Sequence, residues 1–180
     1  LGRGDDGTIW GGEVLRGGYA RAERIGWLKP VPLAGGDGAN REPWRNMLMQ
    51  LDATGFGALA DELLPDRPRA VLRQAAASGL NSPLTSSAGR LFDAVAFALG
   101  AAPDRMSYEG EAGMRLEALA AQSASPEAFP FSRSGGMIDP TPMWAAWGNN
   151  ILATAVALVL IQRRLVGRPI YQTLRKLIPV

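Results

Sequence analysis

The order of strand-forming and helix-forming segments is the feature that most constrains the fold of this chain. Residues 8–15 (TIWGGEVL) and 24–33 (RIGWLKPVPL) are rich in β-branched and aromatic residues and flank a turn-like RGGY, which predicts two paired strands. From residue 42 the pattern turns helical, and one further short strand is predicted over residues 128–132. A strand pair followed by successive helices indicates a mixed α/β, helix-rich fold.

Five segments carry helical signals. They begin near Glu42 and Pro43 and then cover residues 57–64, 68–78, 87–99 and 111–122. Asp37 or Asn40 is the expected cap of the first, and Thr85 or Ser86 that of the fourth.

The last two of these helices are expected to be amphipathic. In the helix over 87–99 one side of the 3.6-residue wheel is predicted to face the core, with Asp93 nearly opposite. In the helix over 111–122 we likewise expect one inward stripe, with Glu117 on its border. The expected inward residues are Leu91, Phe92, Val95 and Leu99 in the former and Ala112, Leu116, Leu119 and Ala120 in the latter.

Composition excludes several kinds of chemistry. The chain has neither cysteine nor histidine, so disulfides, thiolate zinc sites and histidine-based triads cannot form. Its paired glycines lack the following lysine of a phosphate-binding loop and are interpreted as turns. All seventeen acidic residues lie at or before Asp139. Residues 140–180 have no acidic residue and five basic ones. A neutral-to-acidic body with a basic end gives no reason to expect nucleic-acid binding.

Residues 147–180 differ in character from the rest. Ile151–Ile161 is an uncharged apolar run, and Gly148, Asn149 and Asn150 precede it. Those polar residues make the segment marginal for a membrane span, so a spanning helix is not the favoured interpretation. A non-catalytic, membrane-anchored or scaffold protein that uses this segment is the alternative function.

Two carboxylates have alternative interpretations. Asp93 is either a surface acid paired with Arg90 or, because Phe97 lies in the same row, a group that lines a cleft. Glu117 is either a surface acid near Arg115 or a ligand for the hydroxyls of a ribose. In the second interpretation Gly113, four residues earlier, leaves room for that ligand to approach.

Four motifs in register resemble a known family. They are GDDGTIWGGEVL, LKPVPLAGGDGANREPWR, NSPLTSSAGRLFDAVAFALG and MSYEGEAGMRLEALA. Together they are similar to the hydrogenase maturation carbamoyltransferases of the HypF family, in the C-terminal domain related to TsaD-like transferases. The resemblance covers residues 1–144. It implies part of an actin-like ATPase fold with two ribonuclease-H-like lobes, the nucleotide between them, and a small helical subdomain.

The resemblance also implies a reaction. Members of the family use carbamoyl phosphate and Mg-dependent ATP, form a carbamoyl adenylate, and transfer the carbamoyl group to the C-terminal cysteine of HypE. Such a protein is expected to be cytoplasmic. By matching motifs, Asp93 and Glu117 are the expected nucleotide contacts, with Gly113 or Gly110 as the accompanying glycine.

Other parts of the family pattern do not appear in this chain. The metal-binding histidines would lie upstream of Leu1, and a glycine-rich phosphate motif expected after residue 150 is missing. We therefore expect no metal site and no turnover by this chain alone. The predicted division is a partial carbamoyltransferase domain over 1–146 and a divergent tail over 147–180. We ascribe the tail first to a frameshift and otherwise to a chimeric reading frame or to divergence.

Overall fold

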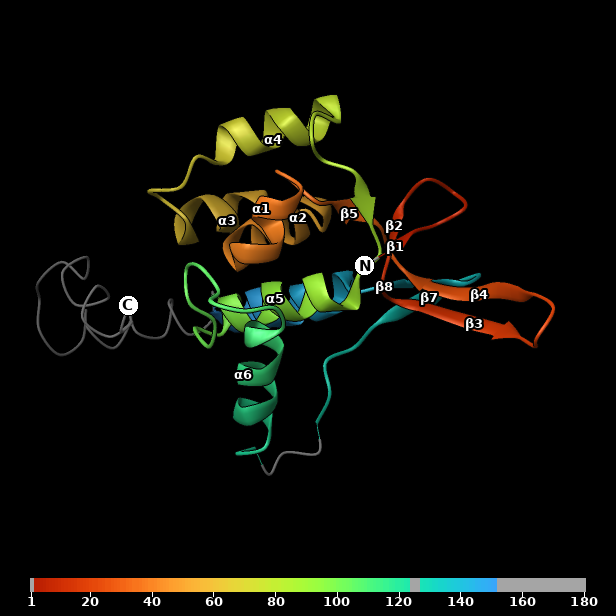
Figure 1. The fold of residues 1–180 in the computed structure, drawn as a ribbon. Coiled ribbons are helices and arrows are strands. Elements are labelled where there is room, and N and C mark those ends of the chain that lie inside the picture. Colours follow the sequence, from red (N-terminus) through yellow and green to blue (C-terminus); the bar gives the residue numbers. More distant parts are fainter. Residues whose placement is uncertain (1, 124–126, 152–180) are drawn as a thin grey trace, which may run out of the picture.

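The computed structural model describes residues 2–123 and 127–151, and it groups helices on one side and strands on the other (Figure 1). The strands are β1 Gly2–Arg3, β2 Ile9–Trp10, β3 Glu13–Gly17, β4 Ala22–Leu28, β5 Val31–Pro32, β6 Leu84–Thr85, β7 Ser132–Ser134 and β8 Met137–Asp139. The helices are α1 Asp37–Arg41, α2 Pro43–Ala53, α3 Gly57–Leu63, α4 Arg69–Ser78, α5 Ala88–Ala98 and α6 Glu111–Ala120. Residues 141–151 are also helical.

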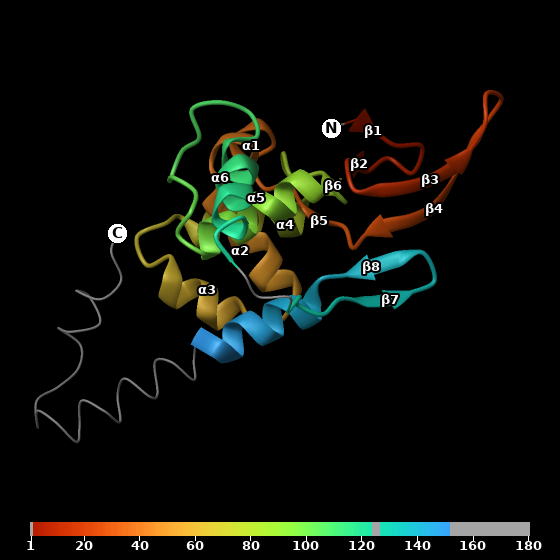
Figure 2. The same cartoon turned by 90° about the horizontal axis from the view of Figure 1, so that it is seen from below.

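The strands form two mixed sheets of four strands each. One has the order β1-β2-β6-β5 and the other β3-β4-β8-β7, and in each the central pair is parallel. The predicted pairing of the first two segments is confirmed by β3 and β4, which lie side by side as a long antiparallel hairpin (Figure 2). Each predicted segment is nevertheless divided, because β2 and β5 belong to the other sheet. With the helices, these sheets confirm the predicted mixed α/β class.

The strand predicted over 128–132 is wrong in extent. The structure has a hairpin instead, in which β7 and β8 pair from Ser132–Asp139 to Ser134–Met137. Gly135 makes the turn with a φ of 58°, a conformation that residues with a Cβ rarely adopt. The pattern hid this hairpin because β7 reads SRS, which has neither alternation nor β-branched residues.

The core lies between α2 and α5, with α3, α4 and the helix over 141–151 around them. Its buried side chains include Leu48, Leu51, Leu59, Leu72, Leu91, Ala94 and Trp144. Trp144 and Trp147, both on the helix over 141–151, meet edge to face with ring centroids 5.5 Å apart. Both are buried in this cluster, which joins their helix to the core.

The predicted core face of α5 is right in part. Leu91 is buried and Val95 packs against the core, but Phe92 and Leu99 are 51% and 44% exposed and Asp93 is only 2% exposed. Ala94 packs in the cluster with α2 and Ala96 in the cluster with α6, and these small residues let neighbouring helices approach closely. The wheel favoured the larger apolar residues and so missed the alanines and Asp93.

The inward stripe of α6 is also shorter than predicted. Ala112 is fully buried and Leu116 is partly buried against α5, but Leu119 is 41% exposed and Ala120 is exposed as well. Because α6 crosses α5 and then projects away from it (Figure 1), only its first turns find a packing partner.

The predicted helix caps need correction. Asp37 and Asn40 belong to the separate short helix α1, and the cap of α2 is Glu42, without a side-chain hydrogen bond. The cap of α5 is Ser87, whose hydroxyl accepts a 3.3 Å hydrogen bond from Arg90 N. Thr85 and Ser86 have other partners, so the helix begins one residue later than expected.

Gly12 lies where the turn between β2 and β3 meets the start of α5. A Cβ there would overlap the carbonyl oxygen of Ser86 and lie 2.9 Å from Ala88 N, both of which are backbone atoms. We expect Gly12→Ala to lower the free energy of unfolding by about 2 kcal/mol or more, because the backbone must shift. Gly18→Ala, which meets nothing within 4 Å, is the control and should change it little. Denaturant titration measures both, and equal effects would contradict this account.

Candidate functional site

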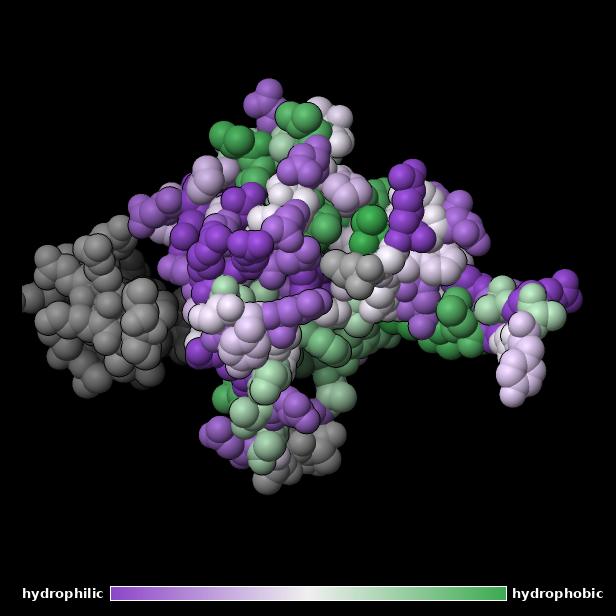
Figure 3. All heavy atoms as spheres, viewed as in Figure 1, coloured by the Kyte–Doolittle hydropathy of each residue, from purple (hydrophilic) through white to green (hydrophobic). Residues whose placement is uncertain are grey.

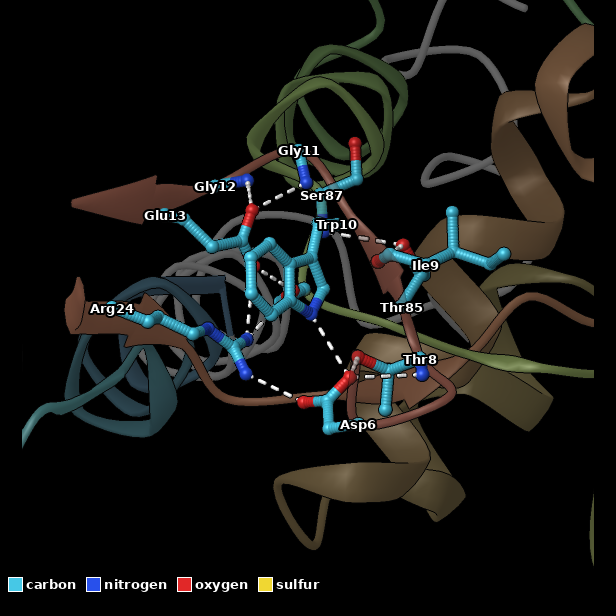
Figure 4. Close-up of polar contacts among 11 residues, drawn as sticks. Asp6, Thr8, Ile9, Trp10, Gly11, Gly12, Glu13, Arg24, Thr85 and Ser87 are labelled. Atoms are coloured by element: carbon cyan, nitrogen blue, oxygen red, sulfur yellow. Dashed lines mark hydrogen bonds and ion pairs between the residues drawn. The ribbon is translucent and has the colours of Figure 1, made fainter. Parts of the chain in front are cut away.

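Arg24 is the centre of a half-buried polar cluster that links the two sheets (Figure 4). Its guanidinium lies over the rings of Trp10 and Trp27, 4.4 and 4.8 Å from their centroids. It also pairs with Asp6 at 2.6 Å and with Glu13 at 2.9 Å. We call these five residues the Arg24 cluster.

The carboxylate of Glu13 ties this cluster to the start of α5. One oxygen accepts hydrogen bonds from Gly11 N at 2.6 Å and Gly12 N at 2.8 Å, and the other accepts from the Ser86 hydroxyl. Glu13 lies in the motif GDDGTIWGGEVL, but no site role was predicted for Glu13 or for Arg24. The two glycines before Glu13 were the available signal, because consecutive free amides suit a carboxylate.

Asp6 closes the cluster on its exposed side. Its carboxylate accepts hydrogen bonds from the hydroxyl and amide of Thr8 at 2.7 and 3.0 Å and from Trp10 Nε1 at 2.9 Å. These donors, together with Arg24, hold the pKa of Asp6 well below its usual range. The carboxylate therefore stays ionised, and the cluster acts as a rigid anchor.

Asp93 is buried in the interface of α5 with α2. Its Oδ2 lies 2.8 Å from Arg90 Nε and 3.4 Å from Asn46 Nδ2, and Asn46 also donates to Ala39 O at 2.8 Å. Burial raises its pKa to about 6, and the nearby Arg90 charge offsets this only in part. The structure thus shows the predicted ion pair with Arg90, but inside the protein rather than on its surface.

The other predicted site residues lie on α6. Gly110 begins the helix with a φ of 84°, and a Cβ at Gly113 would meet nothing within 4 Å. Glu117 is exposed. Helices α5 and α6 pack against each other through Ala96 and Ala112. Asp93 on α5 is nevertheless covered by α2, while Glu117 on α6 faces solvent. The structure does not bring the two carboxylates into either of the clefts described below.

Glu111 was not predicted as a site residue, although it is only 3% exposed. It accepts a 2.6 Å hydrogen bond from Ser107 N and pairs with Arg115 at 2.7 Å. The Ser107 amide is the main reason that its pKa is lowered. Glu111 therefore fixes the segment that leads into α6.

A cleft of about 600 Å³ lies beside that segment. One wall is α1, through Asp37, Asn40 and Arg41, and the other is residues 105–109. We call it the α1 cleft. The Asn40 Oδ1 in its wall accepts a hydrogen bond from Arg90 Nη1, and Arg90 in turn pairs with Asp93. The buried carboxylate is thereby connected to the cleft through two side chains.

A second cleft, of about 470 Å³, lies at the start of α4. Its arginines are already engaged: Arg67 pairs with Asp104, Arg69 with Asp61, and Arg73 with both Asp52 and Asp61. A ligand there would have to break these pairs, so the α1 cleft is the better candidate site.

Within residues 2–123 and 127–151, no three His, Cys, Asp or Glu side chains are grouped so as to hold a metal ion. In the same part of the chain, none of the helices has the length and apolar character needed to cross a membrane. The apolar run over 151–161 lies almost wholly outside the described residues.

Comparison with known proteins identifies the family to which this chain belongs. Residues 1–166 match the family model described as carbamoyltransferase, Kae1-like domain, second subdomain. The chain belongs to the HypF carbamoyltransferase family. Carbamoyltransferase HypF of Rhodobacter capsulatus is 59% identical over 144 residues, which are 80% of this chain and 19% of that protein. The probable HypF of Methanocaldococcus jannaschii is 36% identical over 126 residues, which are 67% of this chain and 16% of that protein.

Two solved HypF structures share the fold of this chain. A crystal structure of full-length HypF in a phosphate- and nucleotide-bound form matches with a TM-score of 0.69 and 26% identity, over 91% of this chain and 24% of that one. HypF of T. kodakarensis matches with a TM-score of 0.67 and 31% identity, over 81% of this chain and 21% of that one. The chain spans about a fifth of the length of these relatives. The family match extends to residue 166, and the division predicted at residue 146 stays a prediction.

Arg24 should be hard to replace even by lysine. A lysine keeps the charge, but its ammonium cannot pair with Asp6 and Glu13 while covering both tryptophan rings. We expect Arg24→Lys to lower the free energy of unfolding by about 1–3 kcal/mol. Arg16→Lys is the control, because the Arg16–Glu23 pair is 71% and 66% exposed and should matter little. Denaturant titration compares them, and a neutral Arg24→Lys would show that the cluster is not an anchor.

Asp93 should make stability fall as pH rises. Its folded pKa of about 6 exceeds the ordinary 3.8, so the folded chain holds a proton that the unfolded chain has lost between these values. At about 1.4 kcal/mol per pKa unit, the wild type should lose about 2 to 3 kcal/mol relative to Asp93→Asn across this window. Urea titrations from pH 3.5 to 7.5 measure this difference.

The control for that titration is Asp66→Asn, since Asp66 is exposed and its replacement should change the free energy of unfolding little. The opposite trend, in which the free energy of unfolding of the wild type rises relative to Asp93→Asn with pH, would contradict this prediction. It would show that the Arg90 charge outweighs burial and lowers the pKa of Asp93 below its ordinary value.

Proposed function

We propose that this chain is a partial carbamoyltransferase domain that acts in the maturation of nickel-iron hydrogenases. Carbamoyl phosphate is hydrolysed to carbamate and phosphate. A carbamate oxygen then attacks the α-phosphate of ATP, which forms a carbamoyl adenylate and releases pyrophosphate. The thiolate of the C-terminal cysteine of a HypE-like protein then attacks the carbamoyl carbon, and AMP leaves. The single observation that carries this proposal is the 59% identity to a HypF carbamoyltransferase over 80% of the chain.

The nucleotide is assigned to the region of α5 and α6. Glu117 and Gly113 fit this role directly, because the carboxylate is exposed and the space above the glycine is open. A charged acceptor such as Glu117 suits the vicinal hydroxyls of a ribose. Gly110, in a left-handed conformation before α6, shapes the same segment. Asp93 is too deeply covered for direct contact in this conformation.

The proposal includes the cellular setting of the reaction. The acceptor is a HypE-like protein, the location is the cytoplasm, and ATP acts with Mg²⁺. The chain alone does not turn over, because it spans only 19% of the relative from Rhodobacter capsulatus. The membrane-anchored or scaffold alternative finds no support in the comparisons, which match carbamoyltransferases.

A chimaera tests this function. Residues 1–146 replace the matching segment of Rhodobacter capsulatus HypF, and carbamoyl-phosphate-dependent conversion of ATP to AMP is measured. We expect the chimaera to be active. Glu117→Ala should lower kcat/KM by about tenfold or more, as expected for the loss of a charged hydrogen bond.

Glu62→Ala, at an exposed glutamate on α3, is the matched control and should leave the rate unchanged. A chimaera that is folded and binds its acceptor but is inactive would contradict the proposed function. Full activity of the Glu117→Ala chimaera would contradict the assigned nucleotide contact.

A further inference from the structure

Four hydrogen-bond donors converge on the carboxylate of Glu13 (Figure 4). Its Oε2 accepts from the Gly11 and Gly12 amides at 2.6 and 2.8 Å. Its Oε1 accepts from Arg24 Nη2 at 2.9 Å and from the Ser86 hydroxyl. Successive main-chain amides next to an arginine form a binding site for a planar anion, and here the protein fills it with its own side chain. We call these four donors the carboxylate site.

The carboxylate site is held in shape by contacts that do not involve the carboxylate inside it. The turn before β3 is tied to the start of α5, because Ala88 N donates to Gly11 O at 3.2 Å. Arg24 stays paired with Asp6 and lies over both tryptophan rings of the Arg24 cluster. The donors therefore remain in position when the Glu13 side chain leaves them, and a second carboxylate finds the site already formed.

One carboxylate can replace another in this site without changing its charge. Arg24 then still has two carboxylate partners, the ligand and Asp6, and the ligand accepts the same four hydrogen bonds that Glu13 gives up. The exchange is therefore close to balanced in charge-assisted hydrogen bonds. The remaining contacts of the ligand decide which carboxylate is bound. A neutral amide, by contrast, leaves Arg24 with one anion fewer and cannot compete.

Exposed apolar side chains beside the site suit a peptide ligand. Val14 and Leu15 follow Glu13 directly and are 49% and 53% exposed. Leu15 lies opposite Arg24 in the register of the hairpin. Hydrophobic residues are also visible on the β3–β4 hairpin in the space-filling view (Figure 3). A peptide whose carboxylate fills the site can thus pack an apolar side chain against β3.

We infer that the carboxylate site binds the C-terminal carboxylate of the acceptor protein, and that Glu13 fills the site while the acceptor is absent. This inference rests on the proposed function, in which the terminal cysteine of the acceptor carries both this carboxylate and the attacking thiolate. Holding the carboxylate limits the reach of the thiolate to the surroundings of α5, the helix to which the nucleotide is assigned. Capture of a terminal carboxylate by successive main-chain amides is a recurring mode of peptide recognition.

The test titrates the full 180-residue chain with the peptide acetyl-Gly-Leu-Cys, once with a free terminal carboxylate and once with a terminal amide. Nuclear magnetic resonance follows the amide signals of Gly11 and Gly12. In the wild type only the acid peptide should shift them, with a Kd of about 1 mM because it must displace a tethered carboxylate. In Glu13→Ala these signals should start elsewhere and return toward their wild-type positions with the acid peptide. Its Kd should be about tenfold lower or more.

The matched control is Glu23→Ala. Glu23 lies on the same hairpin, pairs with Arg16, and has a side chain that is 66% exposed. This variant should keep the wild-type signals and affinities. Acetate, compared with chloride at the same ionic strength, should raise the Tm of Glu13→Ala and leave that of the wild type and of Glu23→Ala unchanged.

A second variant covers the case in which Glu13→Ala does not fold. Glu13→Gln keeps the shape and one acceptor of the side chain but loses its charge, so it should hold the site less tightly than glutamate. The acid peptide should then bind several-fold more tightly to Glu13→Gln than to the wild type.

The outcomes separate this inference from the proposed function. Equal Kd values for the acid and amide peptides, or for the wild type and a folded Glu13 variant, would overturn the inference and leave Glu13 as a structural tie only. An active chimaera together with a chain that does not respond to the acid peptide would overturn it while the proposed function stands. A response to the acid peptide alone supports the inference whatever the activity of the chimaera.

Discussion

The packing of α5 against α2 is the contact on which the rest of the structure depends. Leu48 and Leu51 of α2 meet Leu91 and Ala94 of α5 in the largest buried cluster, and the Arg90–Asp93 pair lies in the same interface. A buried pair of this kind gains little net stability, because removing two charges from water costs about as much as their attraction returns. Arg90 of this pair also donates to the Asn40 Oδ1 of α1, and the hydrophobic contacts supply the stability of the interface.

Local patterns predicted the elements well where the chain carries strong signals. The β3–β4 hairpin follows from aromatic and β-branched residues around RGGY, and α3 and α4 begin and end within a residue of their predicted bounds. Four long motifs were sufficient for the family, since each combines turn glycines with a helix or strand at fixed spacing. These features depend on neighbours in sequence, so the sequence alone can show them.

Features that depend on contacts between distant segments were not visible. The buried side of α5 combines Leu91 with two alanines and a charged pair, and a wheel that weights apolar size shows only the leucine. The β7 strand is polar because its residues are exposed, and the pairing with β8 fixes it instead. The α1 cleft joins residues 37–41 to residues 105–109, more than sixty positions apart. Neither wall has a distinctive pattern by itself.

The hydrogen bond from Met106 N to Arg41 O joins main-chain atoms only. Substitutions at the rim can therefore change the charge and shape of the α1 cleft while its main-chain frame stays in place.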